Sequence, residues 1–119
     1  MISLARFGKS LANAWHGLVE AYRREHSFRI HALALIFLVV LMLGFGIKGA
    51  EAAVLILVAA AVLVLELANS ILERFLDILS PRVGAQVHDA KDMMAAAVLV
   101  ASLAALAVAA IIIIPHIIS

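Results

Sequence analysis

The most informative stretch of this 119-residue chain is Val54–Asp77, VLILVAAAVLVLELANSILERFLD. It begins as an apolar run and then carries Glu66, Asn69, Glu73 and Asp77, the last three at offsets of three, seven and eleven from the first. These offsets place the four side chains on one face of a helix. Carboxylates in or near a bilayer are costly, so they normally face a protein interior or a wet cavity and mark function. The stretch predicts a membrane-spanning helix with a functional polar stripe at one end.

The composition is that of an integral membrane protein. Hydrophobic residues make up 66% of the chain and charged residues only 14%, far from the values of a soluble domain. Residues 30–47, 50–72 and 93–114 are apolar and long enough to span a bilayer. Their short connections predict a single domain over residues 1–119. The absence of cysteine excludes disulfides and thiolate chemistry, and a net charge of +1 gives no electrostatic support for nucleic-acid binding.

The distribution of basic residues predicts how the chain is oriented. Eight of the nine Lys and Arg residues lie in residues 1–29 or 74–91, while Lys48 lies between the first two spans. Because loops on the cytoplasmic side carry an excess of Lys and Arg, the N-terminus and the 74–91 loop are expected in the cytoplasm. Three spans then leave the C-terminus outside.

Residues 2–23 are amphipathic rather than uniformly apolar. Large apolar residues recur there at steps of three or four: Leu4, Phe7, Leu11, Trp15, Leu18 and Tyr22. Polar residues largely occupy the other faces, which predicts a helix that lies in the membrane interface and does not cross it. On periodicity alone, a simple membrane anchor is the alternative.

The segment Arg24–His31, REHSFRIH, carries polar residues to the start of the first span. Glu25 and Arg29 stand at i,i+4 spacing, which allows a simple ion pair. The functional alternative is that Glu25 faces the same cavity as Glu66 and Glu73. Residues 44–49 match the letters of a G-x-G-x-x-G fingerprint, but they follow a membrane helix instead of a strand, so we expect a turn.

A polar segment also precedes the third span. Ser80-Pro81 predicts a helix stop, and Gly84 indicates further irregular backbone, so residues 80–92 are expected to form a loop. Lys91 beside Asp92, at the same membrane face as Glu73, could supply a cation for phosphates. The acidic residues of this segment could equally be favourable charges at a helix N-terminus.

The third span carries a stripe of small residues. Alanines recur at four-residue spacing at positions 97, 101, 105 and 109, a pattern that permits close helix packing within or between subunits. Pro115 and His116 predict the outer end of this helix.

Carboxylate and amide oxygens without Cys or a paired-His motif suit a hard ion such as Mg²⁺. Phosphoryl transfer needs a metal, cations that position phosphates, and a base for the attacking hydroxyl. Glu66 lies deepest in the apolar stretch and is the candidate base, and Glu73 is roughly 10 Å further along the helix axis. An acceptor approaching from the bilayer must be a lipid alcohol. The residues alone also allow a non-catalytic membrane oligomer, or a proton or cation relay past Glu66.

Four motifs give the chain a family resemblance. They are WHGL at Trp15–Leu18, E-x-x-F-R-I-H at Glu25–His31, E-L-x-N-S-x-x-E at Glu66–Glu73, and A-K-D-M-x-A-A-A-V-L at Ala90–Leu99. In this order and spacing the chain resembles the small prokaryotic integral-membrane diacylglycerol kinases, a family that includes the undecaprenol kinases. The resemblance covers nearly the whole chain. It departs at Arg82-Val83-Gly84, where the family usually has E-x-H, and at Ser27, where many relatives have Asn.

The resemblance implies an all-α membrane protein that forms a homotrimer. Each subunit would have three spans and an N-terminal surface helix, and the active sites would be shared between subunits. The protein would be a lipid kinase of the bacterial inner membrane with its active site on the cytoplasmic side. It would transfer the γ-phosphate of ATP to the hydroxyl of undecaprenol or diacylglycerol. The Arg29-Ile30-His31 triplet and the Ser80-Pro81 turn resemble the undecaprenol-kinase branch more closely.

The resemblance also implies roles for single residues. Glu66 would be the catalytic base, and Glu25 and Glu73 would hold the Mg²⁺ that bridges the ATP phosphates. The remaining implied site residues are Asn69, Lys91 and Asp92 at the nucleotide and Arg6 and Arg29 near the substrate or phosphates.

Overall fold

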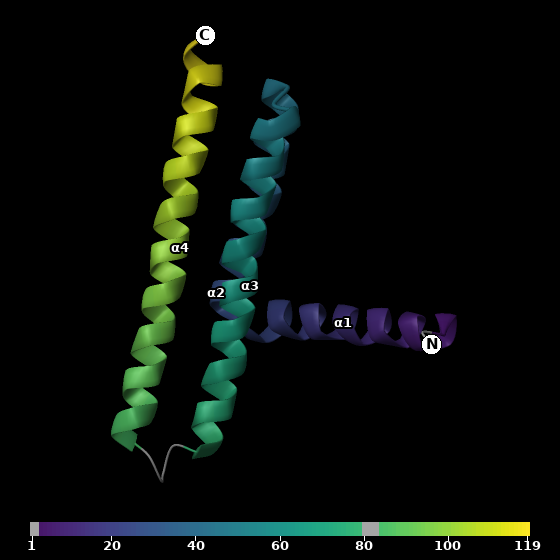
Figure 1. The fold of residues 1–119 in the computed structure, drawn as a ribbon, viewed down its shortest axis with the longest axis vertical. Helices are drawn as coiled ribbons and strands as arrows, with labels where there is room; N and C mark the ends of the chain where they lie inside the picture. The colour runs from purple at the N-terminus through teal and green to yellow at the C-terminus, as the bar shows by residue number, and fades with distance from the viewer. Residues whose placement is uncertain (1–2, 80–83) are drawn as a thin grey trace.

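A computed structural model describes residues 3–79 and 84–119 as four α-helices (Figure 1). They are α1 (Leu4–Arg24), α2 (His26–Phe45), α3 (Gly49–Leu79) and α4 (Gly84–Ile118). By length and composition α2, α3 and α4 can each cross a membrane. α1 stands roughly perpendicular to them (Figure 1). The predicted fold class, three membrane spans with an N-terminal amphipathic helix, is confirmed, whereas the trimer stays a prediction.

α1 is an amphipathic helix whose apolar face is left uncovered. Leu4 is 89% exposed and Trp15 69% exposed. The hydroxyl oxygen of Ser3 accepts a hydrogen bond from the backbone N–H of Arg6 at 3.1 Å and so caps the start of the helix. Such a face suits a helix in the membrane interface. The helix matches the predicted range, of which residue 2 lies outside the described residues.

The corner between α1 and α2 is closed by Arg29. Its guanidinium Nη1 donates to the backbone oxygens of Tyr22 at 3.2 Å and Arg23 at 3.0 Å. These carbonyls belong to the last turn of α1, which has no further helical partners for them. α2 already begins at His26, ahead of the predicted span. Arg29 is hydrogen-bonded to these carbonyls, and the structure shows no pair between Arg29 and Glu25, so the local i,i+4 pair that the sequence allowed is not formed.

A glycine forms the turn between α2 and α3. Gly46 has φ 69°, and the next residue, Ile47, donates its N–H to the carbonyl of Met42 at 2.9 Å. A left-handed residue after the last helical position ends many helices, and glycine adopts it without a steric penalty. The turn predicted for residues 44–49 is confirmed.

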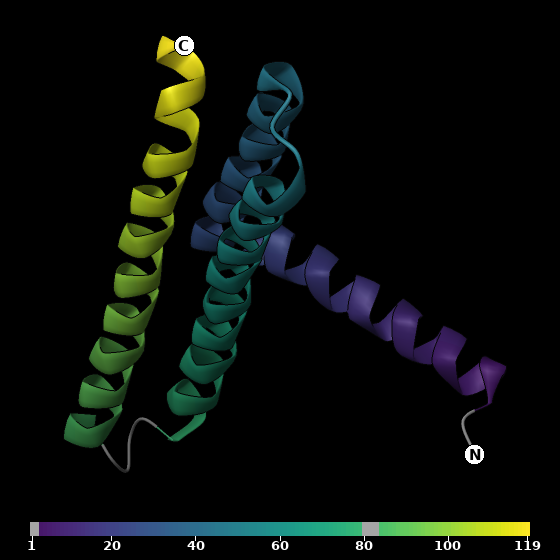
Figure 2. The ribbon, with the colours of Figure 1, turned by 45° about the horizontal axis from the view of Figure 1, so that its top comes forward.

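α3 packs against both other spans and so forms the centre of the chain (Figure 2). The main buried cluster consists of Met42, Ile47, Leu55 and Ile113, near the α2–α3 turn. Leu55 is fully buried. Many other large apolar side chains of the three spans are exposed, among them Phe37, Leu57 and Leu106. This pattern is expected for helices that meet lipid or further copies of the chain.

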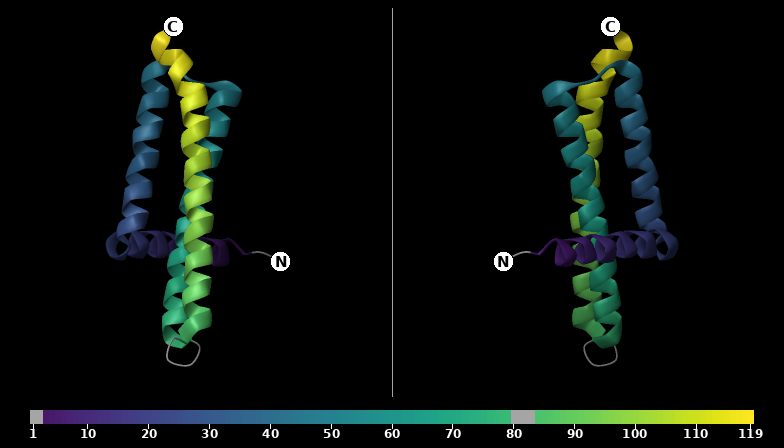
Figure 3. Two further views of the ribbon diagram at one scale, coloured as in Figure 1. Left: turned by 90° about the vertical axis from the view of Figure 1, so that its left-hand side faces the viewer. Right: turned by 90° about the vertical axis from the view of Figure 1, so that its right-hand side faces the viewer.

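The last part of α3 and the first part of α4 extend beyond the level of α1 (Figure 3). At 1.5 Å per residue the 31 residues of α3 are about 46 Å long, well over the ~30 Å hydrocarbon thickness of a bilayer. The two helices therefore continue past the membrane as an antiparallel pair. This pair carries Asp77, the last residue of the polar stripe that begins at Glu66, and Asp77 contacts Lys91 of α4.

The helix of the third span is longer at both ends than predicted. Residues 84–92 are helical, not a loop, because α4 begins at Gly84 and packs beside the extension of α3. Ser80-Pro81 and Arg82-Val83 lie outside the described residues. At the other end Pro115 is inside α4, which continues to Ile118. Proline lacks a backbone N–H and so removes one helical hydrogen bond, but Pro115 lies in the last turn of α4.

Candidate active site

Glu66 is the buried carboxylate of the three spans. Its exposed fraction is 4%, and its Oε2 lies 3.5 Å from Nε2 of His31 in the second turn of α2. A buried carboxylate needs a hydrogen-bonding or charged partner, and His31 is that partner here. The sequence singled out Glu66 but not His31, although His31 was visible in the polar segment before the first span.

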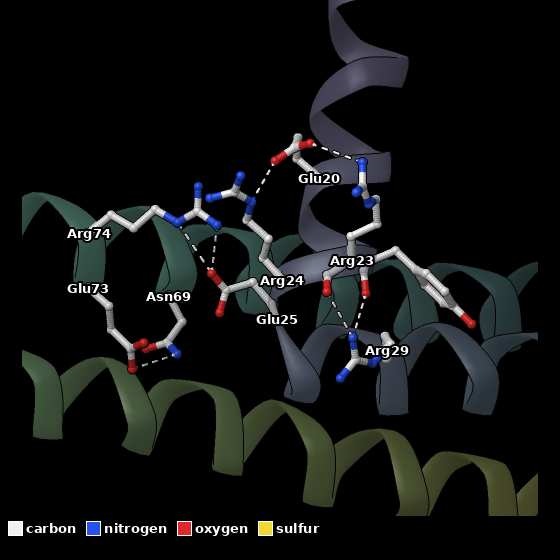
Figure 4. Close-up of polar contacts among 9 residues, drawn as sticks. Glu20, Arg23, Arg24, Glu25, Arg29, Asn69, Glu73 and Arg74 are labelled. Atoms are coloured by element: carbon white, nitrogen blue, oxygen red, sulfur yellow. Dashed lines mark hydrogen bonds and ion pairs between the residues drawn. The ribbon is translucent and has the colours of Figure 1, made fainter.

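Asn69 and Glu73 form a pair one helical turn further along α3. The amide Nδ2 of Asn69 donates to Oε1 of Glu73 at 3.4 Å (Figure 4). The amide oxygen of the same side chain, Oδ1 of Asn69, is buried and has no hydrogen-bond partner in the described part of the chain. This side of α3 therefore offers an unpaired amide oxygen beside a carboxylate.

Glu25 joins the corner of α1 and α2 to α3. Its Oε1 accepts hydrogen bonds from Nη2 of Arg74 at 2.9 Å and from Nε at 3.3 Å (Figure 4). Glu25 therefore binds the residue that directly follows Glu73, the second predicted metal ligand, on α3. No role for Arg74 was predicted from the sequence. No local spacing could have revealed the pair, because its members are 49 residues apart.

Lys91 connects the extended ends of α3 and α4. Its Nζ lies 2.6 Å from Oδ1 of Asp77, which is one turn beyond Glu73 on the polar stripe. Asp92 is exposed, and its Oδ2 lies 3.4 Å from Nε2 of His88 on the same helix. The structure thus brings Lys91 to the end of α3 that carries the predicted site.

The two predicted arginines lie apart from these carboxylates. Arg6 is exposed in the first turn of α1, far from α2 along that helix. Arg29 binds the carbonyl groups at the end of α1, as described above. Within one chain neither arginine is paired with Glu66 or Glu73 among the described residues.

The donor atoms at this end of α3 suit a hard divalent cation. Among residues 3–79 and 84–119 no three His, Asp or Glu side chains gather closely enough to hold a metal by themselves. Mg²⁺, however, is usually bound through one or two carboxylates together with water and substrate phosphates. The carboxylate of Glu73 and the unpaired oxygen of Asn69 match that chemistry, and Glu25 lies on the neighbouring element.

An apolar groove begins beside Glu66. Its volume is about 460 Å³, and its lining comes from α2, α3 and α4: Ile30, His31, Ala34, Leu35, Phe37, Leu38, Leu41, Val58, Ala59, Val62, Ser102, Ala105, Leu106, Ala109 and Ile113. The two polar residues of this lining are His31 and Ser102, and both belong to the end of the groove nearest Glu66. The hydroxyl oxygen of Ser102 is buried without a hydrogen-bond partner in the described residues.

A second, more polar cavity of about 570 Å³ lies between α1 and α3. Glu25 and Arg74 line it together with His16, Glu20 and Ser70. The two cavities approach the polar stripe from different sides. The groove between α2, α3 and α4 is suited to an apolar chain, whereas the cavity between α1 and α3 is lined by charged groups.

Comparison with known proteins identifies the family. The model of the family described as prokaryotic diacylglycerol kinase matches residues 12–113. The chain belongs to this family. A diacylglycerol kinase of Synechocystis sp. is 32% identical over 114 residues, which cover 92% of this chain and 63% of that protein. A diacylglycerol kinase of Escherichia coli K12 is 32% identical over 104 residues, covering 84% of this chain and 82% of its own length.

The family assignment confirms the resemblance read from the motifs. The chain spans less than two thirds of the Synechocystis relative. The matched range contains every predicted site residue except Arg6.

Proposed function

We propose that the protein is a lipid kinase that transfers the γ-phosphate of ATP to the hydroxyl of a lipid alcohol. The observation that carries the proposal is the position of Glu66 in a member of this family. This buried carboxylate contacts His31, and His31 lines the apolar groove. A carboxylate at the polar end of a lipid-sized groove is placed to act on a hydroxyl that arrives from the bilayer.

The groove suits the chain of a lipid within one leaflet. On α4 its lining runs from Ser102 to Ile113, about 16 Å at 1.5 Å per residue. This is about half of the ~30 Å hydrocarbon thickness of a bilayer. An acyl or prenyl chain lying in the groove would bring its hydroxyl end to Glu66. Diacylglycerol and undecaprenol both have an apolar chain and a hydroxyl end, and the phosphate-transfer assay below distinguishes between them.

Glu66 acts as the general base. It takes the proton of the acceptor hydroxyl while that oxygen attacks the γ-phosphorus of ATP, and the bond from this phosphorus to the bridging oxygen of ADP breaks. Glu25 and Glu73, with the amide oxygen of Asn69, would hold Mg²⁺. When bound, Mg²⁺ supplies positive charge that stabilises the phosphate oxygens during transfer.

The basic residues supply further charge for the nucleotide. Lys91 and Arg74 are both paired with carboxylates of the chain, and the phosphates of ATP would compete for them. Asp92 and Asn69 complete the proposed nucleotide contacts. Arg29 keeps the corner of α1 and α2 in place beside Glu25. We assign the site to the cytoplasmic side of a bacterial inner membrane, where ATP is available.

The proposed assembly is a homotrimer with sites shared between subunits. The exposed apolar surface of the three spans supports such an assembly. Arg6, remote from the carboxylates of its own chain, could reach the phosphates of a site only through another subunit.

A proton or cation relay past Glu66 is the second candidate, because the Glu66–His31 contact also suits a relay. The two functions differ in their need for ATP. A relay moves ions without nucleotide, and Glu66→Gln would abolish that flux. A kinase shows no such flux.

The deciding experiment measures phosphate transfer from labelled MgATP in detergent–lipid micelles. Diacylglycerol and undecaprenol are offered separately and together, and Glu66→Gln is the matched control. We expect labelled lipid phosphate from at least one acceptor with the wild-type protein and almost none with the variant. A folded protein that labels neither lipid would refute the proposed function.

A further inference from the structure

A buried base has to release the proton that it collects. The side chain of Glu66 is 5% exposed, so water reaches its carboxyl group poorly. In each turnover of the proposed kinase, Glu66 receives one proton from the acceptor hydroxyl. A carboxyl group that kept this proton could not serve as a base for the next acceptor.

His31 is placed to accept this proton from Glu66. It is the only ionisable side chain paired with Glu66 in residues 3–79 and 84–119, with Nε2 at 3.5 Å from Oε2. Its own side chain is 25% exposed, five times the fraction of Glu66. The imidazole is therefore the more accessible of the two contacting groups.

Other titratable groups on the neighbouring elements are engaged elsewhere. Arg29 binds two carbonyl groups at the end of α1 and lies 3.5 Å from His26. Glu73 and Asn69 on α3 are bonded to each other. On α4 the groove residue nearest this end is Ser102, which does not titrate. None of these groups is placed to exchange protons with Glu66 as His31 is.

We propose that His31 relays the proton from Glu66 to water after each phosphoryl transfer. The inference rests on the proposed kinase activity. The O–H bond of the protonated Glu66 carboxyl breaks as an N–H bond forms at Nε2 of neutral His31. The imidazolium then gives one proton to water and becomes neutral again. One proton has moved from the lipid hydroxyl to water, and both side chains are restored.

The relay predicts a defect that a small base can repair. His31→Ala should lower kcat by about 100-fold, in the range for loss of a proton-transferring group, and leave KM for ATP unchanged. His31→Ala removes an imidazole ring beside Glu66, so the space that it leaves matches the size of added imidazole. Added imidazole should restore turnover in proportion to its concentration, and substituted imidazoles of graded basicity should restore it to graded extents.

Two further variants separate a relay from a structural contact. His31→Gln keeps a side chain that can hydrogen-bond Glu66 but cannot carry a proton, so we expect it to be as slow as His31→Ala. His116→Ala is the matched control, because His116 pairs with Glu51 far from this site. It should retain wild-type turnover and show no response to imidazole.

The outcomes are distinct. An active His31→Gln protein, or a folded His31→Ala protein that binds ATP but gains nothing from any imidazole, would show that His31 only positions Glu66. Full activity in His31→Ala would also refute the relay, while the kinase would stand. Failure of the wild-type protein to phosphorylate any lipid would instead remove the proposed function, and the relay with it.

Discussion

Glu66 and Glu73 lie on the same stripe of α3 and yet have different surroundings. Glu66 is buried against His31, whereas Glu73 is exposed and accepts a hydrogen bond from Asn69. This difference supports the proposal of a base at the buried position and a metal ligand at the exposed one. Two substitutions of equal size can test the assignment.

Glu66→Gln should abolish turnover and spare nucleotide binding. The amide has nearly the shape of the carboxyl group but cannot accept the hydroxyl proton, and loss of a general base typically costs 10²–10⁴-fold, so we expect kcat to fall by about 1,000-fold. Isothermal titration with a non-hydrolysable ATP analogue and Mg²⁺ should give a Kd close to that of the wild-type protein. A large loss of binding would place Glu66 at the nucleotide instead.

Glu73→Gln should weaken binding of the same Mg²⁺–nucleotide complex. It replaces a charged oxygen ligand by a neutral one, and Mg²⁺ prefers carboxylate ligands. We expect Kd to rise by about tenfold, which corresponds to about 1.4 kcal/mol. If Glu66→Gln and Glu73→Gln lose binding equally, the division between base and metal ligand is wrong.

Arg74→Ala should affect Glu25 more than the stability of the fold. Arg74 is 55% exposed, so solvent screens its ion pair, and removing it should lower the free energy of unfolding by less than about 1 kcal/mol. The Glu25 carboxylate, freed of its counter-ion, should become more available to Mg²⁺ when no nucleotide is present. Thermal unfolding with and without Mg²⁺ measures both effects. Arg23→Ala, on an exposed pair, is the control.

Some of these residue contacts could be predicted from sequence, and others could not. Asn69 and Glu73 are four positions apart on one helix, so their proximity follows from helical geometry. His31 with Glu66 and Arg74 with Glu25 join different elements, and their register depends on how the spans pack. The local Glu25–Arg29 pair did not form because Arg29 satisfies carbonyl groups that α1 leaves unpaired.

At the scale of the elements, the groove between α2, α3 and α4 gives a test of where the acceptor binds. Ala59 of α3 lines this groove. Ala59→Leu should partly fill it and raise KM for the lipid about tenfold, in line with the 10- to 200-fold effect of small size changes in apolar pockets. KM for ATP should stay the same. Ala61→Leu changes an exposed neighbour on α3 and serves as control. Equal lipid kinetics in both variants would exclude the groove as the acceptor site.

Periodicity and hydropathy predicted the elements themselves well. The steps of three and four in α1 and the apolar runs of the spans are local signals. The start of α4 was missed because a short polar segment with glycine is typical of a loop. It is helical here because α3 provides a partner beside it, including Asp77 for Lys91.

At the scale of the whole molecule, the alanine stripe of α4 bears on assembly. Ala105 and Ala109 face the groove within the chain, while Ala97 is exposed. Ala101→Leu adds bulk between these regions and should lower the thermal midpoint of the detergent-solubilised protein and its trimer fraction. Light scattering after size exclusion measures the trimer. Unchanged size and midpoint would indicate that this part of α4 meets lipid.

The corner held by Arg29 has a mechanical consequence. α1 projects roughly perpendicular to the three spans (Figure 1), and its last turn is tied by two hydrogen bonds to a residue only two positions before His31. These hydrogen bonds couple α1 to the start of α2, so we expect the two helices to tilt together. If α1 lies in the membrane interface as predicted, a thinner bilayer would shift the plane of this helix, because helices adjust to hydrophobic thickness by tilting. We expect such a displacement to reach the contact between His31 and Glu66 through this corner, so that membrane thickness would affect the activity of the proposed kinase.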